Sequence, residues 1–124
     1  MKYKRKLEKE IRCPLEWGGE VFGGKWKSRI ICVLYSHKTL RYSQLRQELT
    51  NISDAVLADM LKELISDGMV ERIQYNEIPP RVEYLLTEKG KSVLPILQSI
   101  CDWSKKNLLI NLKENYLPAK AVIS

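Results

Sequence analysis

Three cysteines and one histidine are the most reactive side chains of this chain, and their spacing limits the chemistry they could perform. Cys13, Cys32 and Cys101 are widely separated, no Cys-x-x-Cys pair occurs, and His37 has no second histidine to work with. This pattern fits neither a zinc site nor a disulfide framework, and it is typical of a reducing compartment. A single histidine in an expected turn builds no Ser-His-Asp or Cys-His catalytic set. We therefore expect no catalytic residues, no metal and no cofactor.

Cys13 has a distinctive neighbourhood, because it follows Arg12 and precedes Pro14. Proline is favoured in the first helical turn, so we expect a helix over residues 14–22 with Cys13 at its N-cap. The helix dipole, the free amide groups of the first turn and Arg12 would all favour the thiolate, which is the reactive form. Cys13 is thus a candidate regulatory thiol. The alternative is a half-buried cysteine that only packs against its neighbours.

A second set of residues has the spacing of one helix face and could contact DNA. Residues 53–68 carry apolar side chains at helical spacing, which would face a core. Ser53 is suited to begin this helix and Gly68 to end it. The opposite face is polar or small and can approach another molecule closely; it carries Asp54, Ala55, Ala58, Asp59 and Lys62. The candidate DNA contacts of this segment are Ser53, Asp54, Ala55, Ala58 and Lys62. We predict a recognition helix here; an ordinary amphipathic core helix is the alternative for this segment alone.

The preceding residues complete a helix-turn-helix pattern. Ser43 is expected to cap a short helix over residues 44–49, and residues 50–52 are expected to form a tight turn. A short helix, a turn and a longer helix make up the helix-turn-helix motif. In this motif the first helix crosses the DNA backbone and the second enters the major groove. We therefore expect Arg41, Ser43 and Gln44 to hold phosphates.

The residues after this motif predict a β wing. Residues 69–75 and 81–86 are rich in strand-forming residues, and Pro79-Pro80 stiffens the loop between them. We expect a two-stranded hairpin with Arg81 near its tip, where it could reach a phosphate or the minor groove. The alternative for Arg81, and the expectation for Arg72, is an ion pair with neighbouring glutamates.

The flanking segments are expected to position this unit. A helix is predicted over residues 26–36, and a short edge strand over residues 39–41. After Thr87, which is suited to an N-cap, a last long helix should begin near Glu88 and bend at Pro95. Its apolar stripe favours packing against a second copy of the chain. The fold class is therefore α+β, mainly α: a winged helix-turn-helix with flanking N- and C-terminal dimerisation helices.

Length and charge set the organisation and the partner class. The 124 residues are one domain by length, and the net charge of +6 favours a polyanionic partner, nucleic acid before a membrane surface. We divide the chain into a basic N-terminal arm (1–12), the winged helix-turn-helix domain with its dimerisation helices (13–107) and a C-terminal tail (108–124). The arm could follow phosphates; a solvated leader is the alternative. Without a signal peptide or a membrane-spanning run, we expect a cytoplasmic protein and no membrane partner.

Several short motifs resemble those of the HxlR-type transcriptional regulators, winged-helix proteins distantly related to the MarR type. The resemblance extends over residues 12–103, and the string from Pro79 to Tyr84 is its most specific part. The motifs, in chain order, are Cys13-Pro14, Gly24-Lys25-Trp26, Leu64-Ile65-Ser66-Asp67-Gly68, Pro79-Pro80-Arg81-Val82-Glu83-Tyr84, Leu86-Thr87 and Gly90.

This resemblance implies a homodimer, held by its N- and C-terminal helices, that binds a palindromic double-stranded DNA operator and more often represses than activates. In some members the cysteine matched by Cys13 senses thiol-reactive species. One departure is that Ala55 follows Asp54 where family members often carry lysine or arginine. Affinity would then depend more on the arm and the wing.

Two alternatives stay open at this stage. A small-molecule effector, instead of a thiol-reactive one, could bind an aromatic pocket near Trp17, Trp26 and Trp103. The chain could also be a winged-helix module that binds protein and no specific DNA. Salt dependence separates a DNA-binding regulator from such a module, because neutralising phosphates gives a steep dependence of affinity on salt.

Overall fold

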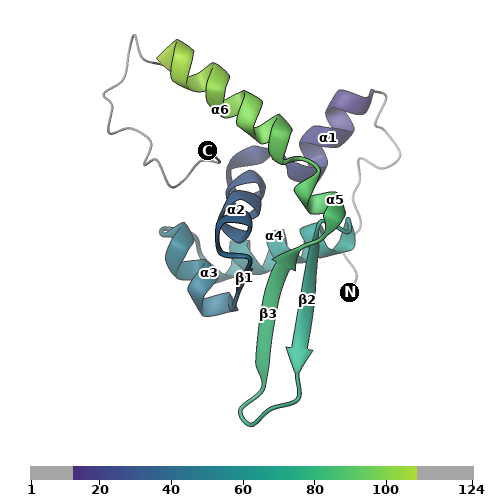
Figure 1. The fold of residues 1–124 in the computed structure, drawn as a ribbon, viewed down its shortest axis with the longest axis vertical. Helices are drawn as coiled ribbons and strands as arrows, with labels where there is room; N and C mark the ends of the chain where they lie inside the picture. The colour runs from purple at the N-terminus through teal and green to yellow at the C-terminus, as the bar shows by residue number, and fades with distance from the viewer. Residues whose placement is uncertain (1–12, 109–124) are drawn as a thin grey trace.

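A computed structural model describes residues 13–108 of the chain, and it shows a helical body with a protruding β hairpin (Figure 1). The predicted arm (1–12) lies outside the described residues, as does the predicted tail except for Leu108, which belongs to the last helix. The elements follow in the order α1 (Pro14–Phe22), α2 (Gly24–His37), β1 (Thr39–Leu40), α3 (Tyr42–Leu49), α4 (Asp54–Ser66), β2 (Val70–Tyr75), β3 (Arg81–Leu86), α5 (Glu88–Lys91) and α6 (Leu94–Leu108).

The sheet is antiparallel with strand order β1-β3-β2, so β3 is its central strand. Val70 pairs with Leu86 and Tyr75 with Arg81, while Thr39 pairs with Leu85 at the base of the hairpin. The two-stranded wing is therefore confirmed, and β1 adds the predicted short edge strand. Figure 1 shows β2 and β3 extending well beyond the helices, with their loop as the far end of the molecule.

The hydrophobic core lies between α2, the helix-turn-helix and the base of the sheet. Helix α2 is its centre, because Ile30, Ile31 and Leu34 are fully buried on one stripe. The helix-turn-helix contributes side chains that are also fully buried: Leu45, Leu49, Leu57 and Leu64. Because these leucines must face the core, the opposite faces of α3 and α4 turn outward.

Both predicted ends of α4 are confirmed. The Ser53 hydroxyl accepts a hydrogen bond from the Val56 amide at 3.1 Å, which satisfies one of the free N–H groups of the first turn. At the other end Gly68 has a φ of +76°, and its amide donates to the Ile65 carbonyl at 2.9 Å. The Met69 amide donates to the Leu64 carbonyl at 2.8 Å, which completes a Schellman motif.

Two helix starts differ from the predictions. Helix α2 begins at Gly24 rather than at Trp26. Helix α3 begins at Tyr42, so Arg41 occupies the N-cap and Ser43 lies inside the first turn; the prediction that Ser43 caps this helix was wrong. The reason is local, because the Gln44 side chain reaches back and its Oε1 accepts from the Arg41 amide at 2.9 Å.

The C-terminal segment forms two helices instead of one long bent helix. Thr87 caps α5 as expected, since its hydroxyl accepts from the Gly90 amide at 3.0 Å. Two turn residues, Ser92 and Val93, follow the end of α5 at Lys91, and α6 begins at Leu94. Pro95 lies in the first turn of α6, where proline is tolerated, whereas inside a longer helix it would remove a hydrogen bond and clash. The proline therefore separates two helices rather than bending one.

Helices α1 and α6 lie on the side of the body opposite the wing (Figure 1). Each carries large apolar side chains in contact with solvent: Leu15 and Trp17 on α1, and Ile96, Ile100 and Trp103 on α6. Within residues 13–108, no helix is long and apolar enough to cross a membrane.

Candidate nucleic-acid interface

The turn between α3 and α4 has an unusual backbone that sets the angle between the two helices. Thr50 and Asn51 have φ values of +31° and +62°. Asparagine adopts this left-handed region more readily than most residues, whereas threonine does so rarely. The turn and the neighbouring face of α3 line an open cavity of about 470 Å³; the lining residues are Ser43, Arg46, Gln47, Thr50, Asn51 and Ile52.

Asp54, the first residue of α4, is held by two side chains of α3. Its Oδ1 lies 3.0 Å from the Arg46 Nε, and the Tyr42 hydroxyl donates to the Asp54 carbonyl at 3.1 Å. Burial, followed by the Asp54 charge, raises the pKa of the Tyr42 hydroxyl, so this group remains a proton donor at neutral pH. The start of α4 is thus braced against α3, and the Asp54 carboxylate is engaged inside the motif.

The outward face of α4 combines short side chains with the charged residues Asp54, Asp59 and Lys62. Ala55 and Lys62 are exposed and Ala58 is half-buried, and their spacing places them on one side of the helix. The exposed Ser53 accepts the capping hydrogen bond, and its hydroxyl proton remains available for an external acceptor. Short side chains on this face would let the helix backbone come close to a partner.

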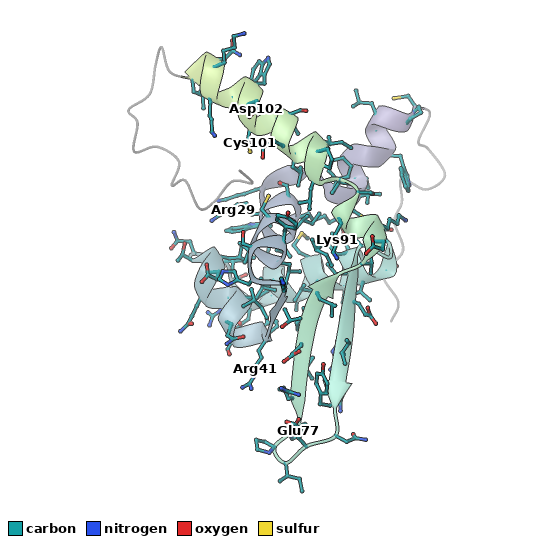
Figure 2. All side chains as sticks on the ribbon, viewed as in Figure 1. Arg29, Arg41, Glu77, Lys91, Cys101 and Asp102 are labelled. Carbon is teal, nitrogen blue, oxygen red and sulfur yellow. The ribbon has the colours of Figure 1, made fainter. Side chains whose placement is uncertain are left out.

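Arg41 and Gln44 lie at the start of α3. The Arg41 side chain is exposed, and it has no ion pair among the residues that the structure describes. Figure 2 shows it below α3, on the side from which the wing extends. The Gln44 carbonyl oxygen is used for capping, but its amide NH₂ can still donate. Both side chains thus keep hydrogen-bond donors available at the start of α3.

Arg81 organises the wing tip instead of standing free. Its Nη2 lies 3.0 Å from Glu77 Oε2, its Nη1 lies 3.5 Å from Glu83 Oε2, and its guanidinium stacks on the Tyr75 ring at 4.0 Å. Its Nε is buried without a hydrogen-bond partner. Figure 2 shows Glu77 at the far end of the wing, where Ile78 is fully exposed.

The wing ion pairs differ from those expected for Arg72. That residue is exposed, and within residues 13–108 it has no ion pair. The Glu83 partner expected for it is bound by Arg81, which lies on the same strand. The alternative given above for Arg81 is therefore the arrangement found in this structure.

Sequence reasoning missed two basic residues of α2 that bind α3 and α4 on the core side of the helix-turn-helix. Lys27 is buried and forms an ion pair with Glu63 of α4. The Arg29 Nη2 donates to the carbonyl of Leu49, the last residue of α3, at 3.4 Å, where a cation also suits the helix dipole. A signal for Lys27 was present, because it lies three residues before Ile30 in the buried stripe of α2.

The three thiols have different surroundings. Cys13 occupies the N-cap of α1 as predicted and is exposed, but its side chain makes no capping hydrogen bond. Cys32 is buried, and burial together with the charge of Cys101 raises the pKa of its thiol to about 11. Cys101 is half-buried. Within the described part of the chain, no three histidine, cysteine or acidic side chains gather as a metal site would require.

The three tryptophans expected near an effector pocket have separate contacts. The Lys89 ammonium lies 5.7 Å from the Trp17 ring, and Lys25 lies 4.7 Å from the Trp26 ring. Trp103 is 66% exposed. A cavity of about 520 Å³ lies elsewhere, between α2, β1, β3 and α5; it is lined by Leu34, Tyr35, Ser36, Lys38, Thr39, Leu85, Leu86 and Lys91.

Comparison with known proteins decides the family. Residues 21–111 match the model of the HxlR-like helix-turn-helix family. This chain belongs to that family. It is similar to an uncharacterised helix-turn-helix transcriptional regulator of Methanothermobacter thermautotrophicus, with 47% identity over 77% of this chain and 72% of that protein. As an HxlR-like protein, the chain is a transcriptional regulator of the helix-turn-helix type.

Solved structures of similar proteins agree with this assignment. The crystal structure of the transcriptional regulator YtcD superimposes with a TM-score of 0.74 at 39% identity, over 78% of this chain and 98% of that one. The redox regulator HypR in its oxidised form superimposes with a TM-score of 0.65 at 36% identity, over 76% of this chain and 96% of that one. The winged helix-turn-helix fold expected from the sequence is confirmed.

Proposed function

We propose that this HxlR-like protein is a homodimeric, sequence-specific DNA-binding repressor that recognises a palindromic operator. The observation that carries the proposal is the braced recognition helix, whose start is fixed by Arg46 and Tyr42 and whose outer face carries short side chains. Such a helix can enter the major groove with little loss of side-chain entropy on its reading face. The residues proposed to lie against base edges are Ser53, Ala55, Ala58 and Lys62, and Asp54 lies beside them at the start of the helix.

The phosphate contacts come from both sides of this helix. Arg41, Ser43 and Gln44 stand at the start of α3 and would hold one phosphate segment. Arg81 would hold another, with a phosphate displacing Glu77 from its guanidinium when the wing approaches DNA. Without DNA, the ion pairs of Arg81 with Glu77 and Glu83 stabilise the conformation of the wing tip.

The dimer is proposed to form through α1 and α6. Both helices expose large apolar side chains on the side opposite the wing, which leaves the reading face free. A two-fold dimer of this kind places its recognition helices about one DNA turn, roughly 10 bp, or a multiple of it apart. The operator should accordingly show two inverted half-sites with that spacing.

Cys13 is the proposed regulatory thiol. It is exposed at the start of α1, and HypR, a structural relative, is a redox regulator. Modification of Cys13 would change the dimer contacts of α1 and with them the separation of the two recognition helices. In Cys13→Ser we expect DNA binding to persist and the response to a thiol oxidant to disappear; an unchanged response would contradict this role.

The decisive test is fluorescence anisotropy with the reduced protein and its own upstream DNA, at two salt concentrations and with excess unrelated DNA. We expect tight, salt-dependent binding that the competitor does not abolish. Lys62→Met should weaken this binding, whereas Lys105→Met, an exposed lysine of α6, should not. Binding without sequence preference would contradict the proposal and would favour a protein-interaction module.

A further inference from the structure

Lys27 is the one buried charged residue among residues 13–108, and its partners come from two other helices. Its Nζ donates to the carbonyl of Glu20, in the last turn of α1, at 2.8 Å. The same Nζ forms an ion pair with Glu63 Oε1, in the C-terminal half of α4. One ammonium group therefore joins α1, α2 and α4.

Because this contact is buried, it is favourable only while its partners keep their positions. The Lys27 and Glu63 side chains are only 7% and 12% exposed, so water cannot replace a partner that moves away. A buried charge left without its partner is strongly destabilising, whereas an exposed pair can separate at little cost. The three helices must therefore keep their relative positions for both charges to remain satisfied.

We propose that Lys27 and Glu63 are a positioning pair that makes α1 and the recognition helix move as one unit. If α1 shifts away from α2, the Glu20 carbonyl either loses its hydrogen bond to the Lys27 ammonium or pulls this ammonium with it. In the second case Glu63 moves as well, because it is ion-paired with the same ammonium. The apolar contacts of Val21 also hold α1, but they are not directional and permit rotation and sliding.

This link has a consequence for regulation, which rests on the proposed function. Cys13 begins α1 and Glu20 lies near its end, while Lys62, on the proposed DNA-reading face, is next to Glu63. A displacement of α1 therefore changes the orientation in which α4 is presented to DNA. The pair acts on recognition through α4 and does not itself contact DNA.

The test replaces both charges by apolar side chains of similar size, Lys27→Met with Glu63→Leu, in the full chain. Removing both together avoids leaving a single buried charge. The matched control is Lys91→Met with Glu88→Leu, which removes an exposed Lys–Glu pair at 3.6 Å. Circular dichroism and thermal unfolding establish that each variant is folded.

The first measurement needs no DNA and follows amide hydrogen exchange in the peptides of α1 and α4. In the wild type we expect the two helices to exchange as one cooperative unit. In the Lys27/Glu63 variant, α1 should exchange at least about tenfold faster while the buried part of α4 remains protected. The control should match the wild type; unchanged exchange of α1 in the Lys27/Glu63 variant would overturn the proposal.

The second measurement compares affinity for the operator with affinity for unrelated DNA. We expect the ratio to fall at least about tenfold in the Lys27/Glu63 variant while binding to unrelated DNA is kept. Faster exchange of α1 with an unchanged ratio would mean a merely structural pair and would overturn the positioning role. If the wild type itself showed no sequence preference, the proposed function would fail, and the exchange data alone would decide whether α1 and α4 are coupled.

A conservative variant covers the case in which the double replacement does not fold. Lys27→Arg keeps the charge but replaces one compact ammonium, which serves both partners from a single atom, by a larger planar fork whose donors have fixed directions. We expect this variant to fold, to exchange α1 faster and to lose part of its discrimination. Wild-type behaviour in both measurements would overturn the proposal.

Discussion

Neutralising Asp54 should weaken the fold slightly and strengthen DNA binding. Asp54→Asn keeps the size and the oxygen acceptor, but it removes the charge that holds Arg46 at 3.0 Å. Because the two side chains are 68% and 51% exposed, their ion pair contributes roughly 0.2–1 kcal/mol to stability. The negative charge at the start of α4 contributes about as much through the helix dipole. We therefore expect the free energy of unfolding to fall by about 1 kcal/mol.

The effect on DNA has the opposite sign. Without its carboxylate partner, Arg46 lies beside the turn and is free to bind a phosphate. One more neutralised phosphate makes the slope of log affinity against log salt steeper by about 0.9. A hydrogen bond to a charged group contributes about 1.5 kcal/mol, so affinity at low salt should rise roughly tenfold.

Anisotropy titrations at several salt concentrations would measure both quantities, with urea unfolding for stability. The matched control is Asp59→Asn, an exposed aspartate of the same helix that has no ion pair in the described residues. Its slope should stay at the wild-type value, because it releases no arginine. A flatter slope or weaker binding in Asp54→Asn would refute the reasoning and show that the carboxylate itself is needed at the DNA.

Three further outcomes are expected. Ser53→Ala removes the cap of α4 and should lower the free energy of unfolding by about 1 kcal/mol in urea titrations. Gly90→Ala should destabilise by about 1–3 kcal/mol in thermal unfolding, because a Cβ there would collide with the Met69 carbonyl oxygen. Burial and the charge of Cys101 raise the pKa of Cys32 from 9.0 to about 11. The folded state therefore holds this proton more tightly, and its contribution to stability is present below pH 9 and lost as the pH rises through about 11. Thermal unfolding followed across this pH range should show a smaller loss in Cys32→Ala.

The ends of the recognition helix and the strands of the wing could be predicted because their causes are local. Ser53 and Gly68 act on amides and carbonyls within a few residues of themselves. Pro79-Pro80 lies between two runs of strand formers, and this order allows a hairpin irrespective of the remaining chain. The α3 cap was harder, because Ser43 and Gln44 both offer a plausible local bond and the structure contains the one from Gln44.

The sequence predicted where the site residues lie, but not which side chains they contact. The sequence placed Asp54, Ala58 and Lys62 on one helix face, which follows from the helical period alone. It did not show that Asp54 is held by Arg46, or that Arg81 is held by Glu77 and stacks on Tyr75. These partners depend on the angle between α3 and α4 and on the twist of the wing.

The sequence by itself thus determined the order of the elements, the helix-turn-helix and the family, because periodicity, caps and motifs are properties of neighbouring residues. The tertiary structure alone decided which charges are buried and which are free. Lys27 shows the difference: its place in the stripe of α2 could predict burial, but its two partners lie on α1 and α4, 7 and 36 residues away in the chain. Only the packing of the three helices brings these groups to one point, and a pattern within a single helix contains no information about that packing.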